Sequence, residues 1–269
     1  MKNNKKIVDA RRNKILLEVQ TKTEILVNDI SEKLNVSPLT IRRDLQILEE
    51  NGFIERFYGG ARFKDTNNTK SDNSYGNYII QSIAKFATRY IEDNDTIFIN
   101  SSKTVLAMIP YIKNKNITIV TNNGRALLLD NNPNVSIFLT GGEVNTTKKS
   151  LTGEFALRNL KKVSATKSFL GCSGINVNGI TTVVPQEVTI NEYMLDRCSG
   201  NIFILADSSK IGREYSFLSG SIKKINNLIT DAPISDEIIN IEKQGVNVIN
   251  INDYKGVWKY HTPSYIKTF

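Results

Sequence analysis

Residue types that commonly carry chemistry are scarce in this chain of 269 residues. Its one histidine, His261, lies near the C-terminal end, so most of the chain lacks the usual general base and metal ligand. The two cysteines, Cys172 and Cys198, lie in apolar surroundings without CxxC or Cys/His spacing, which predicts buried, reduced thiols. We therefore expect no metal site and no cofactor.

Long apolar runs are also missing. None approaches the ~18 residues that a membrane span requires. The basic start, MKNNKKIVDARR, leads into charged residues, whereas a secretory signal would continue as an apolar stretch with a small-residue cleavage site. With 40% apolar and 23% charged residues, the composition is typical of a folded globular protein. These features predict a cytoplasmic protein with no membrane partner.

Positive charge is in modest excess and is unevenly distributed. The formal net charge is +8 and the pI is about 9.3. Residues 1–64 hold 13 Lys and Arg against 9 Asp and Glu, while residues 65–269 hold 22 against 18. The same excess of four positive charges is thus concentrated in a much shorter N-terminal segment, which favours a polyanionic partner there.

The chain is long enough for about two domains of ~150 residues each. Residues 65–77, DTNNTKSDNSYGN, lack apolar periodicity and consist almost wholly of polar and turn-forming residues, which predicts a linker. We therefore expect one domain at residues 1–64 and a second at residues 78–269.

Strands and helices alternate in the predicted second domain. Seven apolar runs rich in Ile, Val and Phe predict strands at residues 96–99, 117–121, 135–140, 167–171, 201–206, 227–230 and 246–251. Six other segments predict helices at residues 78–92, 104–113, 125–130, 154–160, 186–198 and 236–244. This alternation predicts an α/β fold with a mostly parallel sheet covered by helices.

Residues 37–51 have the pattern of an amphipathic helix. Ser37 suits the N-cap, Pro38 suits the first helical position, and Gly52 can supply the left-handed residue that ends the helix. Three apolar side chains form a narrow stripe that must face a core: Ile41, Leu45 and Leu48. The opposite face and its flanks carry a mixed set of side chains: Leu39, Thr40, Arg42, Arg43 and Gln46.

That mixed set suits a DNA groove. Arg43 can hold guanine O6 and N7 with two hydrogen bonds, and Gln46 can hold adenine N6 and N7 in the same way. The methyl groups of Leu39 and Thr40 can contact thymine. On the flanks, Thr40 and Arg42 can hold phosphates, which set the register of the protein on the duplex.

The preceding segments predict the rest of a helix-turn-helix motif. Ile25 and Val27 alternate as in a short strand, and Asn28 can cap a helix whose inward face holds Ile30 and Leu34. A short turn at residues 35–36 then leads to Ser37. A supporting helix precedes the motif and has three inward apolar side chains: Ile15, Leu16 and Val19.

A basic hairpin, the wing, is predicted to follow. An extended run begins at Phe53 and Ile54, and Gly59-Gly60 can provide two positive φ angles for a tight turn. The basic side chains of the hairpin are Arg56, Arg62 and Lys64. We predict that the helix and the wing bind DNA through eight residues: Ser37, Leu39, Thr40, Arg42, Arg43, Gln46, Arg56 and Arg62.

A capped amphipathic helix followed by a hairpin also occurs in proteins that bind no DNA. The segment VSPLTIRRDLQILEENGFIERFYGGA, however, resembles the N-terminal signature of the DeoR family of bacterial regulators, because the turn, the Ser cap, TIRRDL, Leu-Glu, Gly, Arg and GGA stand in the family's order. The resemblance implies a sequence-specific transcriptional regulator, a repressor of sugar catabolism or transport genes. It also implies a homo-oligomer, a dimer or a tetramer, on a double-stranded operator.

The resemblance extends over nearly the whole chain. It implies a C-terminal domain that resembles ribose-5-phosphate isomerase and coenzyme A transferases in fold and senses a phosphorylated sugar or a related metabolite. In open α/β sheets, ligands bind beyond the carboxyl ends of the strands. At one such end, residues 100–104 combine hydroxyls, backbone N–H groups, a helix dipole and the charge of Lys103, which predicts an anion site. An ordinary capped turn has the same pattern.

Further loops match family motifs in order: residues 121–123, 141–142, 150–153, 171–174, 179–182 and 206–210. Asn122, Glu187, Asp207 and Lys210 can bind sugar hydroxyls or phosphate, but Asp207 and Lys210 can equally form a structural ion pair. The glycines can also serve only to shape turns. We predict twelve effector-binding residues: Asn100, Ser101, Ser102, Lys103, Thr104, Asn122, Gly141, Gly142, Gly171, Glu187, Asp207 and Lys210.

One loop departs from the family pattern. Family members commonly carry Asp-Ser-Gly-Thr-Thr where residues 100–104 read Asn-Ser-Ser-Lys-Thr. Asn100 cannot act as a carboxylate base, and Ser102 restricts a backbone that glycine would leave free. The departure favours a sensor over an enzyme. The alternative is a sugar-phosphate isomerase with an appended DNA-binding domain, in which Glu187 and Asp207 move protons.

Overall fold

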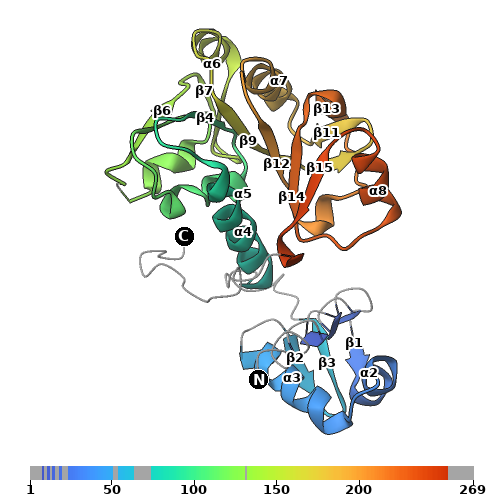
Figure 1. The fold of residues 1–269 in the computed structure, drawn as a ribbon. Helices are drawn as coiled ribbons and strands as arrows, with labels where there is room; N and C mark the ends of the chain where they lie inside the picture. Colours follow the sequence, from blue (N-terminus) through green and yellow to red (C-terminus); the bar gives the residue numbers. More distant parts are fainter. Residues whose placement is uncertain are drawn as a thin grey trace. The chain divides into compact units, whose positions relative to one another are not determined.

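The computed structural model describes residues 8, 11, 12, 14, 15, 18, 19, 24–50, 54–63, 74–130 and 132–253. The chain divides into two compact units, Met1–Tyr78 and Ile79–Phe269 (Figure 1). Several residues named in the sequence predictions lie outside the described part of the chain: Leu16, Gly52, Phe53, Lys64 and His261.

The first unit is a winged helix-turn-helix. Its elements are β1 (Glu24–Leu26), α2 (Val27–Leu34), α3 (Pro38–Glu50), β2 (Ile54–Phe57) and β3 (Gly60–Phe63), and the strands form an antiparallel sheet in the order β1-β3-β2. The predicted stripe of α3, namely Ile41, Leu45 and Leu48, is buried. It packs in one core with Ile15, Val19, Ile25, Val27, Ile30, Ile54 and Ala61. The predicted core face of the helix is therefore confirmed.

The turn between α2 and α3 uses Asn35, which adopts a left-handed conformation (φ 51°) and caps α2. The predicted cap at the other end of α2 is wrong. The helix begins at Val27, with Leu26 as its N-cap and no side-chain hydrogen bond, so Asn28 is an exposed residue of the first turn. Val27 is consequently helical, and its burial comes from the inward face of α2.

Only one of the two wing glycines has a positive φ angle. Gly59 (φ +90°) forms the turn with Tyr58, whereas Gly60 is the first residue of β3 and has no positive φ. Gly60 is required for a different reason, because a Cβ atom there would overlap with the carbonyl oxygen of Ile25 and lie 2.6 Å from the ring of Phe57. The strand β1 thus reaches β3 over a glycine.

A seven-stranded parallel sheet forms the centre of the second unit, in the order β15-β14-β12-β9-β4-β5-β6, from red to light green in Figure 1. Its strands are β4 (Thr96–Ile99), β5 (Ile117–Thr121), β6 (Val135–Leu139), β9 (Lys167–Gly171), β12 (Ile202–Leu205), β14 (Asn227–Thr230) and β15 (Asn247–Asn250). All seven predicted strands are present, within one residue or two of the predicted ends. The mostly parallel α/β fold is confirmed.

Helices cover both faces of this sheet. They are α4 (Ser74–Ala87), α5 (Lys103–Leu106), α6 (Gly153–Leu160), α7 (Val188–Asp196) and α8 (Asp236–Glu242). One face packs through Phe98, Leu170 and Ile204 against apolar residues of α6, α7 and α8. On the other face, Phe203 stacks on Phe169 and meets Tyr90, which follows α4.

Some predicted helices have different bounds. Helix α4 begins at Ser74, so residues 74–77 of the predicted linker are helical. The predicted helix 104–113 is broken into α5 and a 3-10 turn, η2 (Ile109–Tyr111), where Pro110 has no N–H to continue a helix. In place of the predicted helix 125–130 the chain forms another 3-10 turn, η3 (Gly124–Leu128).

Two small antiparallel sheets are additions to the predicted fold. One is the hairpin of β7 (Glu143–Asn145) and β8 (Ser150–Thr152), and the other has the order β10 (Gly174–Asn176), β11 (Gly179–Thr182), β13 (Phe217–Ser221). Strands β8 and β11 belong wholly to segments interpreted above as motif loops, whereas β7 and β13 lie outside them. Such strands are short and rich in glycine and polar residues, so they lack the apolar runs of the central sheet.

Candidate functional site

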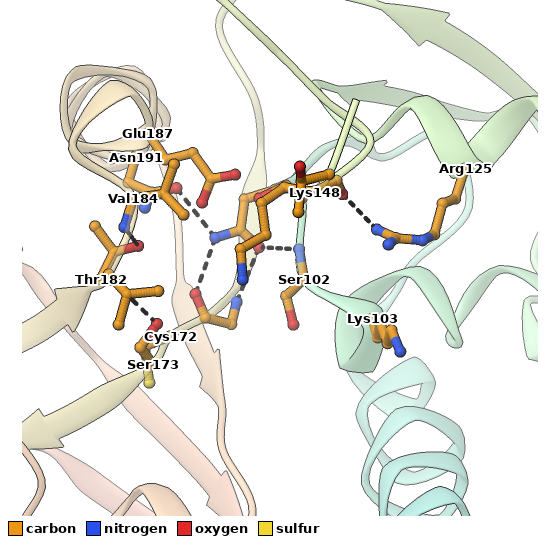
Figure 2. Close-up of a pocket in the computed structure, with 15 residues that line it drawn as sticks. Ser102, Lys103, Arg125, Lys148, Cys172, Ser173, Thr182, Val184, Glu187 and Asn191 are labelled. Atoms are coloured by element: carbon orange, nitrogen blue, oxygen red, sulfur yellow. Dashed lines mark hydrogen bonds between the residues drawn. The ribbon is translucent and has the colours of Figure 1, made fainter. Parts of the chain in front are cut away.

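A pocket of about 400 Å³ lies at the carboxyl ends of β4 and β9 in the second unit (Figure 2). Its lining residues come from five segments of the chain: Asn100, Ser101, Ser102, Lys103, Arg125, Thr147, Lys148, Gly171, Cys172, Ser173, Thr182, Val183, Val184, Glu187 and Asn191. This is the place where open α/β sheets bind ligands. Six of the twelve predicted effector residues line the pocket: Asn100, Ser101, Ser102, Lys103, Gly171 and Glu187.

Asn100 ties together the elements that form the floor of the pocket. Its Nδ2 donates to the carbonyl oxygen of Gly171 (2.9 Å) and to Oδ1 of Asn191 (3.0 Å). Its Oδ1 accepts from the backbone N–H groups of Gly171 (3.0 Å) and Ser102 (3.3 Å). Both amide hydrogens and the oxygen are therefore engaged, and the side chain is buried. Asn100 joins β4, β9 and α7 and has no free donor for a ligand.

Ser102 occupies an unstrained position. Its backbone is extended (φ −65°, ψ 139°), which suits any residue, so a serine in place of the family's glycine causes no backbone strain here. The Ser102 hydroxyl accepts from Thr104 N–H and caps α5. A Cβ atom on Gly171 would overlap with this hydroxyl, so the glycine that the site requires is Gly171. Because α5 has a single turn, few peptide dipoles are aligned and the helix adds little to anion binding.

Side chains supply the positive charge of the pocket. Lys103 is exposed at the rim, and Arg125 and Lys148 reach the pocket from η3 and from the β7–β8 turn (Figure 2). Arg125 Nη1 donates to the carbonyl oxygen of Lys148 (2.6 Å), which holds the two segments together. Within the described residues, neither lysine ammonium group has an ion-pair partner. Arg125 and Lys148 were not among the predicted site residues.

Asn123 connects these cations to the loop after β4. Its side-chain oxygen accepts from Arg125 N–H (3.1 Å) and its Nδ2 donates to the carbonyl oxygen of Ser102 (3.3 Å). The Thr-Asn-Asn motif at residues 121–123 marks this corner of the site, but the residue that contacts the pocket loops is Asn123 and not the predicted Asn122. Asn122 is fully buried, and its Nδ2 donates to the carbonyl oxygen of Leu151 (3.2 Å) behind the pocket wall.

Glu187 provides the one carboxylate of the pocket lining. It lies at the end of η4 (Pro185–Glu187), on the wall opposite Arg125, and only 8% of the residue is exposed (Figure 2). Its Oε1 is buried and has no hydrogen-bond partner among the described residues. An unsatisfied buried acceptor costs about 1–3 kcal/mol, so a ligand hydroxyl that donates to it gains binding energy.

Other predicted effector residues lie outside the pocket lining. Thr104 is buried in α5, and Gly141 and Gly142 (φ +67° and +107°) form the turn between β6 and β7. Asp207 follows β12 and caps a 3-10 turn by accepting from Ser209 N–H (2.9 Å). The alternative role of Asp207, an ion pair with Lys210, is also absent within the described part of the chain.

Burial controls two titratable groups beside the pocket. Desolvation raises the pKa of the Cys172 thiol to about 12, which Lys210 opposes weakly, so the thiol is protonated and not a nucleophile at neutral pH. Burial also raises the pKa of Asp231, although Ser208 N–H donates to its carboxylate (2.7 Å) and favours the charged form. Cys172 and Cys198 are free, as the sequence predicts, but both are only partly buried, whereas the sequence predicted buried thiols.

In the first unit, the outward face of α3 carries the predicted base-reading residues. Leu39, Arg42, Arg43 and Gln46 are exposed, and among the described residues neither arginine has an ion-pair partner. Ser37 accepts from Thr40 N–H (3.2 Å), so it acts as the N-cap of α3.

Asp44 is a buried acidic residue of α3 whose role the sequence did not indicate. Arg11 Nε (2.5 Å) and Arg12 Nε (2.8 Å) both donate to its carboxylate, which is 2% exposed. The three residues form a partly buried ionic cluster that joins the N-terminal segment to α3. Within TIRRDL, the arginines therefore face solvent while the aspartate faces the core.

The wing arginines point to opposite faces of the sheet. Ala61 pairs with Arg56 and Ile25, and because Ala61 and Ile25 are buried, Arg56 lies on the face toward the helices. There its Nε donates to Glu49 of α3 (2.7 Å).

Arg62 lies on the other face. It stands in one row between Glu55 of β2 and Glu24 of β1. Its Nη2 donates to Glu55 (3.1 Å).

Comparisons with known proteins agree with this geometry. The family model of the DeoR-like helix-turn-helix domain matches residues 11–67, and that of the DeoR C terminal sensor domain matches residues 80–232. The chain belongs to the DeoR family. It is a DNA-binding transcriptional regulator with an N-terminal helix-turn-helix domain and a C-terminal sensor domain.

Curated relatives of the chain are named as regulators. The HTH-type transcriptional regulator YulB of Bacillus subtilis is 31% identical over 91% of this chain and 98% of its own length. The lactose phosphotransferase system repressor of Staphylococcus aureus is 31% identical over 76% of this chain and 84% of its own length. GolR of Listeria innocua is 30% identical over 84% of this chain and 91% of its own length.

Solved structures overlap with part of the fold. A D-ribose-5-phosphate isomerase complex with phospho-erythronic acid covers 50% of this chain and 53% of its own, with 18% identity and a TM-score of 0.36. The eIF2B-beta2-delta2 complex of C. thermophilum covers 78% of this chain and 60% of its own, with 15% identity and a TM-score of 0.44. Scores at this level assign no activity.

Among the described residues, no three His, Cys, Asp or Glu side chains lie close enough together to hold a metal ion. None of the helices in the described ranges is both long and apolar enough to span a membrane.

Proposed function

We propose that this regulator is a repressor of genes for sugar catabolism or transport and that a phosphorylated sugar in the pocket controls it. The observation that carries the proposal is the charge of the pocket lining. Three cations, Lys103, Arg125 and Lys148, accompany one carboxylate, Glu187. The excess of two positive charges matches a phosphate monoester, which is close to a dianion at pH 7.

The hydrogen-bonding groups of the pocket suit a sugar. Glu187 Oε1 lacks a donor within the described residues, and a sugar hydroxyl can supply one. The hydroxyls of Ser101 and Ser173 are half-buried in the lining and add neutral donors and acceptors. The name of the Staphylococcus aureus relative, a lactose phosphotransferase system repressor, supports both repression and a link to sugar metabolism.

We propose that the pocket senses its ligand and does not convert it. Isomerisation of a sugar phosphate needs a group that moves a proton between carbon atoms. Asn100 cannot do so, because its amide is fully engaged by Gly171, Asn191 and Ser102. Asp207 lies outside the pocket lining, so Glu187 is the one carboxylate of the lining that is available as a base. Incubation with pentose and hexose phosphates, followed by NMR, tests this proposal. Steady formation of an isomer would establish the enzyme instead.

A homo-oligomer on the operator is part of the proposal. A two-fold dimer places its two α3 helices on half-sites about 34 Å apart along the duplex, or a multiple of that distance. Footprinting of the operator measures the spacing. Protection of a single half-site, with no second site at such a distance, would contradict a symmetric dimer.

The effector site is tested by thermal shift with a panel of sugar phosphates and the matching free sugars. A ligand at 100 times its Kd stabilises the folded unit by about 2.7 kcal/mol. We expect a phosphorylated sugar to raise Tm and its unphosphorylated form to have no effect. Replacement of Lys148 by Met should reduce the shift because it removes a cation but keeps the aliphatic stem.

Lys162→Met is the matched control, since Lys162 is exposed and does not line the pocket. It should leave the shift unchanged. An equal shift with free and phosphorylated sugar, or an unchanged shift in Lys148→Met, would contradict the proposed phosphate contact.

A further inference from the structure

Each of the two wing arginines forms an ion pair with a glutamate, and the two ion pairs lie on opposite faces of the wing sheet. Arg56 pairs with Glu49, and Arg62 pairs with Glu55; both pairs join residues seven positions apart, and all four side chains are partly exposed. The Arg56 pair links the wing to the recognition helix α3. The Arg62 pair lies on the opposite face of the wing sheet and connects two adjacent strands.

Glu49 makes two contacts with one residue of the wing. Its Oε1 accepts from the backbone N–H of Arg56 (2.9 Å), and its Oε2 accepts from Arg56 Nε (2.7 Å). Strand β2 is at the edge of the sheet, so this N–H has no strand partner. The Glu49 carboxylate thus accepts from the backbone N–H of the edge strand and also orients the arginine side chain. Within the described residues, the terminal nitrogens of Arg56 make no hydrogen bond.

The location of Glu49 places Arg56 beside the predicted DNA-binding face of α3, which carries Leu39, Arg43 and Gln46. Glu49 follows Arg42 by seven residues, which is two helical turns, so both lie on the same flank of α3. Arg42 is exposed and has no ion-pair partner among the described residues. Arg42 and the terminal nitrogens of Arg56 therefore form a basic row along one edge of the face that carries Leu39, Arg43 and Gln46.

We infer that Glu49 is a positioning residue for DNA binding: it holds Arg56 beside α3 so that Arg56 contacts a backbone phosphate, while Arg62, held by Glu55 on the far face, makes no such contact. An arginine fixed in this way loses little conformational entropy when it binds. Simple charge repulsion gives the opposite expectation for Glu49, because removal of a carboxylate near DNA should tighten binding. Whether removal of the Glu49 carboxylate weakens or tightens DNA binding therefore distinguishes positioning from charge repulsion.

The test uses the full chain and a fluorescein-labelled DNA duplex of about 30 base pairs of arbitrary sequence, because phosphate contacts do not depend on sequence. Anisotropy titrations at several KCl concentrations give the affinity and its salt slope. We expect Arg56→Ala to weaken binding about tenfold and to reduce the slope by about 0.9, the contribution of one phosphate. Arg62→Ala should leave the slope unchanged.

The variants of the two carboxylates test the positioning role. We expect Glu49→Ala to weaken binding several-fold and the double variant Glu49→Ala/Arg56→Ala to bind no more weakly than Arg56→Ala, because both changes remove the same contact. Glu49→Gln, which still offers an acceptor to the Arg56 N–H, should lie between Glu49→Ala and the wild type. Glu55→Ala is the matched control and should bind as well as the wild type or more tightly.

Tighter binding by Glu49→Ala, additive losses in the double variant, or an unchanged salt slope in Arg56→Ala would each overturn the inference. Circular dichroism melting identifies variants with a damaged fold. If Glu49→Ala does not fold, Glu49→Gln and the two arginine variants still test the inference. A larger reduction of the salt slope in Arg62→Ala than in Arg56→Ala would show that Arg62, and not Arg56, contacts the phosphate.

Discussion

At the scale of single residues, Asn100 holds together the floor of the proposed effector pocket. Its two N–H groups reach two acceptors, the carbonyl oxygen of Gly171 and Oδ1 of Asn191. A carboxylate at this position could not donate to either of them. The neutral amide thus fits a site that already contains Glu187 and leaves the three cations of the lining in excess.

We predict that Asn100→Asp destabilises the second unit at neutral pH. The carbonyl oxygen of Gly171 loses its side-chain donor and faces a buried carboxylate, which costs about 1–3 kcal/mol. In a unit of this size, each kcal/mol of lost stability lowers Tm by roughly 2–4 °C. Calorimetry measures the fall in Tm. The control is Asn240→Asp, because Asn240 is exposed.

The destabilisation should shrink in acid. Burial raises the pKa of a carboxyl group in the folded state, so the cost is present above that pKa and disappears as the pH falls below it, where the protonated group can donate again. A loss of stability that is the same at pH 4 and pH 7 would contradict this account of Asn100.

At the scale of elements, the turn between β6 and β7 shows why two neighbouring glycines are not equivalent. Gly141 (φ +67°) and Gly142 (φ +107°) both adopt conformations that favour glycine. Around Gly141 there is room for a Cβ atom. At Gly142 a Cβ atom would overlap with the carbonyl oxygen of Thr152 and lie 3.0 Å from Cβ of Ala156. The glycine therefore allows the β7–β8 hairpin to pack against α6.

We predict that Gly142→Ala is more destabilising than Gly141→Ala. Both variants acquire backbone strain of about 1 kcal/mol, but only Gly142→Ala also pushes the hairpin away from α6. Chemical denaturation of the two variants measures the difference. Equal stabilities would show that the overlap at Gly142 is relieved at no cost.

Displacement of the hairpin also moves Lys148, which lies in its turn. Gly142→Ala should therefore weaken effector binding, whereas Gly141→Ala should not.

At the scale of the whole molecule, the two units have separate hydrophobic cores and separate candidate sites. The predicted DNA-binding face of α3 lies in the first unit and the proposed effector pocket in the second. By thermodynamic linkage, an effector that changes the affinity for DNA is itself bound more tightly or more weakly by the same factor when DNA is present.

We predict two resolvable unfolding transitions in calorimetry. Duplex DNA should raise the Tm of one transition, and the sugar phosphate identified by thermal shift should raise that of the other, because a ligand stabilises the unit that binds it. Lys148→Met should reduce only the effector-dependent shift. A single transition that responds equally to both ligands would show that the two units unfold as one cooperative structure.

The sequence alone determined the elements whose signal is local. The seven strands of the central sheet and the buried stripe of α3 follow from the spacing of apolar residues, because each element must bury one face whatever its neighbours are. Short strands such as β7 and β10 lack that signal and were missed.

Only the tertiary structure decided which distant residues meet. Arg125 and Lys148 enter the pocket because the strand order brings their loops to one edge of the sheet, and strand register sends Arg56 and Arg62 to opposite faces. Asn100 is engaged by Gly171 and Asn191, 71 and 91 residues away. Such contacts arise from pairing and packing between distant segments, so the local spacing of residues does not predict them.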